Sequence, residues 1–164
     1  MKIRPERPAD VDAIRLVTTA AFETAPHSNG TEARIIEGLR AAGALIVSLV
    51  AVDEREIVGC VAFSPVTVAS ANGGWYGLGP VSVRPDRQRR GVGQSLIRAG
   101  IGQLMSLRAA GCVVLGDPGY YRRFGFESDP ALTYGVGPSP YFQRLVLGGP
   151  PATGEVVYHS AFES

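Results

Sequence analysis

Cysteine and histidine are scarce in this chain of 164 residues. Its two cysteines, Cys60 and Cys112, both lie in apolar stretches typical of strands. This placement favours buried, reduced thiols in a cytosolic protein over a disulfide framework. The two histidines lie far apart, and no cysteine and histidine have the spacing of metal ligands. We therefore expect neither disulfides nor a metal site.

Long apolar runs and an excess of one charge are missing as well. The longest apolar stretch, 41–52, contains Gly43 and Ser48 and is too short to cross a bilayer, and no apolar signal segment stands at the N-terminus. The net charge is +1, and no aromatic side chains interleave with the arginines of 84–90. We expect a cytoplasmic protein with neither a membrane nor a nucleic-acid partner.

The composition that remains is typical of a soluble globular protein. Hydrophobic residues make up 45% and charged residues 19%, and a chain of this length can bury a sizeable core. No internal repeat or linker divides it, so we expect a single domain over residues 1–164. Helical periodicity and strand-like stretches alternate in the order β-α-α-β-β-β-α-β-α-β, which predicts a mixed α/β sheet. The expected helices cover 8–21, 31–42 and 96–107, with a short one before Gly125, and the expected strands cover 45–52, 56–68, 75–83, 112–115, 141–147 and 156–159, after an edge strand at Ile3.

The segment 81–96 has the pattern of an anion-binding cradle. A short apolar strand, 81–83, runs into a basic turn that contains Gly91 and Gly93, and an amphipathic helix follows at once. The first N–H groups of a helix have no partners inside it, and its N-terminus carries roughly half a positive charge. Glycines let a phosphate approach these N–H groups, and Arg87, Arg89 and Arg90 add positive charge. The ligand should therefore carry phosphate.

Two familiar phosphate loops do not match this segment. A P-loop needs a lysine followed by serine or threonine after its last glycine, but Gly93 is followed by Gln94 and Ser95. A dinucleotide fingerprint needs a third glycine where Leu96 stands. Both interpretations are therefore excluded.

Two motifs together resemble the Gcn5-related N-acetyltransferase (GNAT) superfamily. The hexapeptide Gln88-Arg89-Arg90-Gly91-Val92-Gly93 matches the pattern Q/R-x-x-G-x-G/A, between a strand and a long helix. Downstream, the segment from Tyr121 to Phe126 matches Tyr-x-x-x-Gly-Phe. The residues around this second motif look most like those of a bacterial subgroup of predicted N-acetyltransferases. The resemblance covers roughly residues 2–126 and fades in the Pro- and Gly-rich tail.

The resemblance implies a fold and a cosubstrate. The fold is a central, mostly antiparallel mixed sheet that splays after the fourth strand, at Val83, and is flanked by helices. Acetyl-CoA would enter the gap, with its pantetheine arm along the strand and its pyrophosphate on the N–H groups of 89–94 and the Ser95 hydroxyl. An N–H group near Val83 could polarise the thioester oxygen. The residues expected to bind acetyl-CoA are Val81, Ser82, Val83, Gln88, Arg89, Arg90, Gly91, Val92, Gly93, Gln94, Ser95 and Tyr121.

The resemblance assigns catalytic roles less completely. Tyr121 corresponds to the family's acid, which reprotonates the CoA thiolate; alternatively it only packs on the cofactor, or Tyr120 faces the site. Glu32 is the best carboxylate for a general base, although a helix N-terminus favours such a charge anyway. His27 is a rival or partner, and a water chain would need no dedicated base. Asp117 stands where many relatives carry an Asn.

We expect an N-acetyltransferase that moves the acetyl group of acetyl-CoA directly to a primary amine. The segments 25–31 and 126–140 carry few charges apart from Glu127 and Asp129, and 134–142 is aromatic and apolar. These features favour a small, uncharged or amino-acid-like acceptor, with a peptide N-terminus or a lysine as further options. The alternative is a non-catalytic acetyl-CoA-binding sensor or scaffold. The resemblance also allows a homodimer, because family members often dimerise through late strands, and 156–158 could serve that purpose or simply close the sheet.

Overall fold

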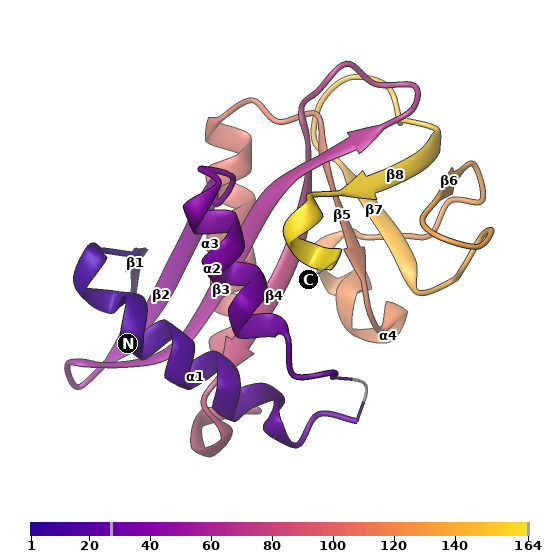
Figure 1. The fold of residues 1–164 in the computed structure, drawn as a ribbon. Coiled ribbons are helices and arrows are strands. Elements are labelled where there is room, and N and C mark those ends of the chain that lie inside the picture. The colour runs from indigo at the N-terminus through magenta and orange to yellow at the C-terminus, as the bar shows by residue number, and fades with distance from the viewer. Residues whose placement is uncertain (27, 164) are drawn as a thin grey trace.

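The computed structural model describes residues 1–26 and 28–163, which form a mixed α/β structure (Figure 1). The helices are α1 (Val11–Glu23), α2 (Glu32–Ala41), α3 (Val92–Ser106) and the short α4 (Pro118–Tyr121). Single 3-10 turns lie at Pro8–Asp10, Pro85–Arg87, Arg122–Phe124 and Ser160–Glu163. The strands are β1 (Lys2–Pro5), β2 (Val47–Asp53), β3 (Glu56–Val68), β4 (Trp75–Val83), β5 (Gly111–Leu115), β6 (Leu132–Thr133), β7 (Phe142–Val146) and β8 (Gly154–Tyr158).

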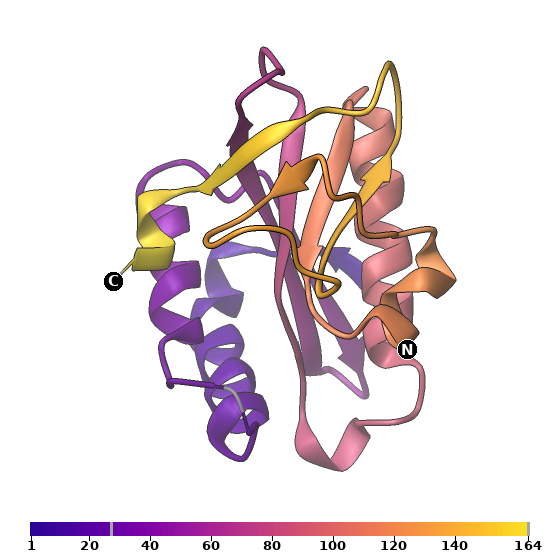
Figure 2. The same cartoon turned by 90° about the vertical axis from the view of Figure 1, so that its right-hand side faces the viewer.

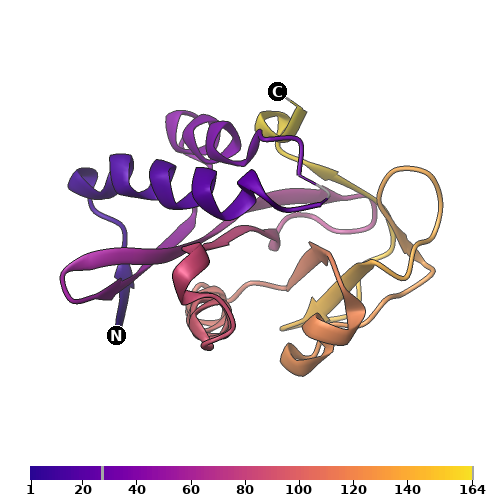
Figure 3. The same cartoon turned by 90° about the horizontal axis from the view of Figure 1, so that it is seen from below.

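The sheet has the strand order β1-β2-β3-β4-β5-β7. Neighbours along this path are antiparallel except β4 and β5, which run parallel. The far end of the long strand β3 pairs with β8, and β8 also pairs with β6. Helices α1 and α2 cover one face and α3 covers the other (Figure 2 and Figure 3). The expected mixed, mostly antiparallel sheet flanked by helices is confirmed.

The last strand resolves an alternative that the sequence leaves open. Val66, Thr67 and Val68 of β3 pair with Tyr158, Val157 and Val156 of β8, so this segment closes the sheet within the chain. The two-residue strand β6 was not predicted, since it lies within a stretch expected to be loop. Two residues are too few to show an alternating pattern.

Helix α3 packs closely on the sheet because a glycine faces a phenylalanine. Leu96, Gly100 and Leu104 are buried on one side of α3, against Phe63 of β3. A Cβ atom at Gly100 would lie 2.1 Å from Cε1 of Phe63. Leu107, the last residue of the expected helix, lies one residue beyond the end of α3 and is 53% exposed.

Strands β4 and β5 separate soon after they begin. Their pairing consists of Trp75 with Gly111, Tyr76 with Cys112 and Gly77 with Val113. Beyond Gly77, β4 continues along β3 while β5 follows β7, so the two strands diverge toward the bottom of Figure 1. The expected splay after the fourth strand therefore lies between β4 and β5, and it opens at Gly77, well before Val83.

A β-bulge accompanies this separation. Val61 pairs with Val81 and Phe63 with Leu78, so Gly79 and Pro80 of β4 lie opposite a single residue of β3. Gly79 has φ +132°, which glycine adopts readily and other residues rarely do. A bulge bends its strand and increases the local twist. The bulge thus turns the rest of β4 away from the direction of β5.

Two glycines of α3 provide a test of this packing. Gly100→Ala should lower the free energy of unfolding by ~1–3 kcal/mol, because the new methyl group collides with Phe63. Gly102→Ala should raise it by up to ~1 kcal/mol, because Gly102 is exposed, nothing lies within 4 Å of its Cβ position, and alanine favours helix. Urea denaturation measures both. Equal effects of the two substitutions would contradict the proposed close contact.

Candidate active site

The loop between β4 and α3 presents backbone N–H groups to solvent. Arg89 has φ +65° and Gly91 has φ +82°, both in the left-handed region. Alternation of such residues with right-handed or extended ones makes N–H groups converge into a concave anion site. The N–H of Ser95 donates to the carbonyl oxygen of Gly91 at 3.0 Å, which is the first hydrogen bond of the α-helical pattern. The N–H groups of 92–94 come before it and therefore have no acceptor within the helix. Nothing lies within 4 Å of a Cβ position at Gly91, so this approach is open.

These residues surround a hollow of about 280 Å³, which we call the cradle hollow. It is lined by Val83, Arg87, Gln88, Arg89, Gly91, Val92, Gly93, Gln94 and Tyr120. The structure thus brings together most of the residues that the sequence predicts for acetyl-CoA. Ser95 and Arg90 belong to the same loop and helix but do not line the hollow. The side chain of Ser82 is buried on the other face of β4, where its Oγ donates to Oγ1 of Thr18 at 3.2 Å.

The arginines of this region form two groups. Arg84 pairs with Asp86 at 2.6 Å and Glu56 at 3.1 Å, and Arg87 pairs with Asp53. These two guanidinium groups therefore hold the loop against the β2–β3 turn. This corrects the expectation that Arg87 is a free charge.

The second group of arginines has no carboxylate partner within the described part of the chain. Its members are Arg89, Arg90, Arg98, Arg122 and Arg123, which lie on the cradle loop, on α3 and beyond α4. The guanidinium of Arg98 lies 5.0 Å from the ring centre of Phe124, and that of Arg123 lies 4.5 Å from the ring centre of Tyr120. Their uncompensated charges give this side of the molecule a positive potential.

Strand β4 turns peptide groups toward the gap. The N–H of Arg84 donates to the carbonyl oxygen of Val58 in β3 at 2.8 Å, so by strand alternation the peptide groups of Val83 point away from β3. Nε2 of Gln88 donates to the carbonyl oxygen of Val83 at 3.0 Å. This carbonyl therefore already has a hydrogen-bond partner. Beyond Gly77, none of the described strands pairs with the edge of β4 that faces the gap.

The two adjacent tyrosines occupy different positions. Tyr120 lines the cradle hollow, with its hydroxyl oxygen 3.4 Å from a Cβ position at Gly93. The Tyr121 ring lies against Gly116 and meets the ring of Phe126 edge-on at 5.9 Å. Burial raises the pKa of Tyr121 to about 12. Burial also raises the pKa of Tyr120, opposed by the charges of Arg123 and Arg98.

Glu32 lies in a separate hollow of about 300 Å³ between α1, α2 and their connection. Its Oε1 accepts a hydrogen bond from Ser28 Oγ at 2.7 Å, and it is the first residue of α2. Thr18 lines this hollow too and contacts Ser82, so the hollow borders the face of β4 opposite to α3. The structure does not bring Glu32 into the cradle hollow. His27 lies outside the described residues.

Asp117 has a local structural partner. Its Oδ1 accepts the N–H of Gly119 at 2.9 Å, which caps the N-terminus of α4. Aspartate caps helices as well as asparagine does, so the departure from the family's residue leaves this cap intact.

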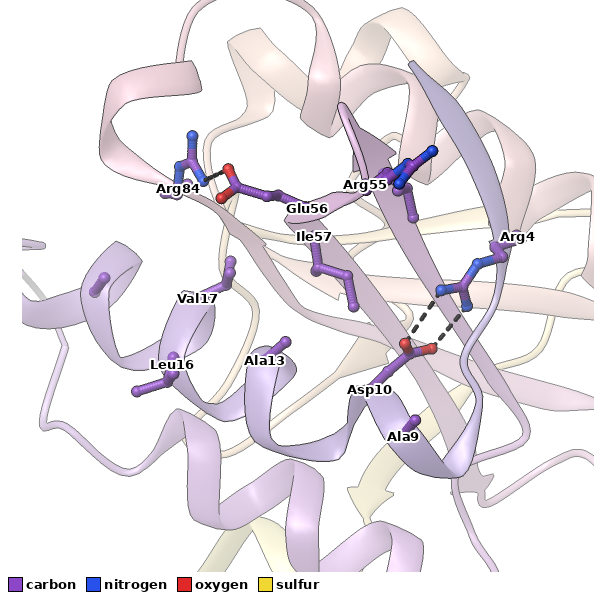
Figure 4. A pocket seen from close by; sticks show the side chains of 12 residues that line it. Arg4, Ala9, Asp10, Ala13, Leu16, Val17, Arg55, Glu56, Ile57 and Arg84 are labelled. Carbon is purple, nitrogen blue, oxygen red and sulfur yellow. Dashed lines mark hydrogen bonds and ion pairs between the residues drawn. The ribbon is translucent and has the colours of Figure 1, made fainter.

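A third hollow, of about 670 Å³ and therefore larger than the cradle hollow, contains none of the residues predicted for the site. It lies between α1 and the β2–β3 hairpin (Figure 4), with apolar side chains such as Leu16, Val17 and Ile57. The bidentate pair of Arg4 with Asp10 lies at one end and the pair of Arg84 with Glu56 at the other. Size alone would favour this hollow as a ligand site. The converging N–H groups and unpaired arginines favour the smaller cradle hollow.

Neither a metal-binding cluster nor a membrane-spanning helix occurs among the described residues. No three histidine, cysteine, aspartate or glutamate side chains gather to hold a metal ion in residues 1–26 and 28–163. None of the helices described there is long and apolar enough to span a membrane.

Comparison with known proteins gives one consistent family. A family model described as an acetyltransferase (GNAT) domain matches residues 45–128. The uncharacterized N-acetyltransferase YhbS of Escherichia coli K12 is 38% identical over 128 residues, which cover 77% of this chain and 74% of that protein. YjhQ of the same organism, also an uncharacterized N-acetyltransferase, is 35% identical over 135 residues, which cover 81% and 72%.

Solved structures agree with the sequence comparison. A GNAT family acetyltransferase from Brucella melitensis, in complex with acetyl-CoA, has a TM-score of 0.88 and 50% identity and covers 98% of this chain and 97% of its own. YhbS from Escherichia coli, in complex with CoA, has a TM-score of 0.90 and 34% identity, with coverage of 99% and 92%.

The two groups of arginines lead to a prediction about binding. The double variant Arg89→Gln/Arg90→Gln should raise the Kd for acetyl-CoA about tenfold, or ~1.4 kcal/mol, because two unpaired charges are lost from the loop expected to bind the phosphates. Arg108→Gln should change it less than about twofold, since Arg108 lies beyond the opposite end of α3. Calorimetric titration measures both. If Arg108→Gln weakened binding as much per charge, net charge and not the cradle would be responsible.

Proposed function

Because this chain belongs to the GNAT family of N-acetyltransferases, we propose that it transfers an acetyl group directly from acetyl-CoA to the primary amine of a small, amino-acid-like acceptor. The family makes the chain an N-acetyltransferase with acetyl-CoA as cosubstrate. The acceptor class, the site residues and their roles are our proposal. The observation that carries it is the cradle hollow beside the open edge of β4.

We assign the phosphates of acetyl-CoA to the cradle. The convergent N–H groups of 89–94, with the Ser95 hydroxyl, suit the pyrophosphate, and the backbone of 81–83 suits the amide-bearing pantetheine arm. Val83 would use its N–H, since its carbonyl accepts from Gln88. An N–H directed at the thioester oxygen would stabilise the developing oxyanion by about 3 kcal/mol.

The transfer requires two proton movements. The amine nitrogen forms a bond to the carbonyl carbon and loses a proton, and the carbon–sulfur bond breaks to release a thiolate that gains one. We assign Tyr121 as the acid for the thiolate. A phenol with a pKa of about 12 is a weaker acid than a free thiol with a pKa of about 8.5, so full transfer would be uphill by ~5 kcal/mol.

Burial of the thiolate narrows this difference, because it raises the thiol's own pKa. Tyr121 would therefore first stabilise the leaving sulfur as a hydrogen-bond donor and then complete the proton transfer. On the acceptor side, we assign Glu32 as the base. Its hollow is separate from the cradle hollow, so intervening water would have to carry the proton to it. A water chain alone is the alternative.

The acceptor surface favours a small amine of low charge. Glu127 and Asp129, the acidic residues expected near the acceptor, both pair with Arg144, at 3.2 and 3.3 Å. Arg144 thus neutralises one of their two negative charges, which leaves too little charge for strong binding of a polycation. Exposed Val136 and Tyr141 extend an apolar surface there. A homodimer and a cytoplasmic location stay predictions from the sequence.

The assignment of Tyr121 can be tested against its neighbour. Tyr121→Phe should lower turnover about a hundredfold or more while the Kd for acetyl-CoA changes less than about twofold, because only the donor for the thiolate is lost. Tyr120→Phe removes the same group from the cradle hollow and should leave turnover within about threefold. Thiol release from acetyl-CoA with a panel of small primary amines measures the rates.

Two outcomes would overturn parts of this proposal. A large loss in Tyr120→Phe with none in Tyr121→Phe would transfer the acid role to Tyr120. Tight acetyl-CoA binding without thiol release to any amine would favour the sensor or scaffold alternative.

A further inference from the structure

A buried amide lies behind the connection that carries the proposed acid. Gln143 of β7 pairs with Val114 of β5, and only 1% of its surface is exposed. Gln143 belongs to no sequence motif, because a lone glutamine in a short strand matches none. Its position next to the end of β5 places it where the connection to α4 begins.

The amide of Gln143 holds this connection in place. Its Nε2 donates to the carbonyl oxygen of Gly116 at 3.1 Å and to that of Tyr141 at 3.3 Å. The N–H of Gly116 donates to the same Tyr141 oxygen at 2.9 Å. Both carbonyls of this corner are thus bound by one side chain, which fixes the Gly116 peptide relative to β7.

Gly116 in turn fixes the proposed acid. A Cβ atom on Gly116 would lie 2.5 Å from Cε2 of Tyr121 and 3.5 Å from its Cζ, so the ring rests on this backbone. The N–H of Tyr121 donates to the carbonyl oxygen of Asp117, the next residue, at 3.0 Å. A shift of the Gly116 peptide would therefore move the phenol.

The orientation of the Gln143 amide leaves one atom unsatisfied. Because both its partners are carbonyl oxygens, the nitrogen must face them, and Oε1 has no hydrogen-bond partner among the described residues. A buried acceptor without a partner destabilises a protein, and this cost offsets much of the stabilisation from the two hydrogen bonds that the amide donates. Stability alone is thus a poor explanation for the amide.

We propose that Gln143 is a positioning residue for acetyl transfer, which holds the Gly116 peptide so that the Tyr121 phenol is directed at the leaving sulfur. This inference rests on the role of Tyr121 under the proposed function. It predicts that the amide matters for rate and for the Tyr121 environment, and not for folding or for acetyl-CoA affinity.

The test replaces the amide with apolar side chains of similar size. Gln143→Met and Gln143→Leu should unfold at nearly the same urea concentration as the wild type, because removal of the unsatisfied Oε1 offsets the lost hydrogen bonds to Gly116 and Tyr141. They should bind acetyl-CoA within about twofold of the wild type. With the best amine of the panel, kcat should fall about tenfold or more while KM for acetyl-CoA changes little. Ser64→Ala, which removes the other buried unsatisfied side-chain oxygen, is the matched control and should leave kcat unchanged.

A spectroscopic measurement keeps this test separate from the proposed function. With ¹³C-labelled tyrosine rings, the Tyr121 signal is identified by its loss in Tyr121→Phe. Both Gln143 variants should move this signal and leave that of Tyr134 in place, whether or not any amine is turned over. An unmoved Tyr121 signal, or kcat equal to that of the wild type, would overturn the proposal. Parallel losses of stability and activity would reduce Gln143 to a structural role and overturn it as well.

Discussion

The separation of β4 from β5 beyond Gly77 is the constraint on which the site depends. A strand in the middle of a sheet normally satisfies both of its edges, but the bulge at Gly79 and Pro80 turns β4 away from β5. The peptide groups of Val83 are consequently directed into a gap. The same separation places the cradle loop at the end of one strand and the Tyr121 connection at the end of the other. We therefore propose that a thioester following β4 from the cradle reaches the Tyr121 phenol.

The arginines around this gap differ in whether a carboxylate neutralises them. Arg84 and Arg87 are neutralised by carboxylates, which fixes the cradle loop to the β2–β3 turn without adding to the positive potential. Arg89 and Arg90 have no such partner in the described chain, which is why we propose them as the charges that attract phosphate. On the acceptor side, Arg144 pairs with both nearby carboxylates. Arginine therefore stabilises the loop structure at one part of the site, and at another we propose that it attracts the ligand.

Sequence patterns predicted those parts of the molecule that local chemistry determines. The central strand was predicted with the bounds 75–83, and the start of α3 followed from Gly91 and the periodicity after it. The bulge was missed, although glycine followed by proline inside a strand is its usual signal. Gln143 could not be found, because its role arises from contacts with residues distant in sequence. The pairing of Arg87 with Asp53 could not be predicted either, because these two residues are also distant in sequence.

Residue-resolved hydrogen exchange, with and without acetyl-CoA, tests the central claim most directly, because the proposed contacts are mainly backbone contacts. The account predicts that exchange slows at the N–H groups of Val83 and of 89–94 when acetyl-CoA binds, while the N–H of Arg108 exchanges at an unchanged rate. Binding of acetyl-CoA with unchanged exchange at Val83 and 89–94 would contradict it, and would place the cosubstrate outside the gap between β4 and β5.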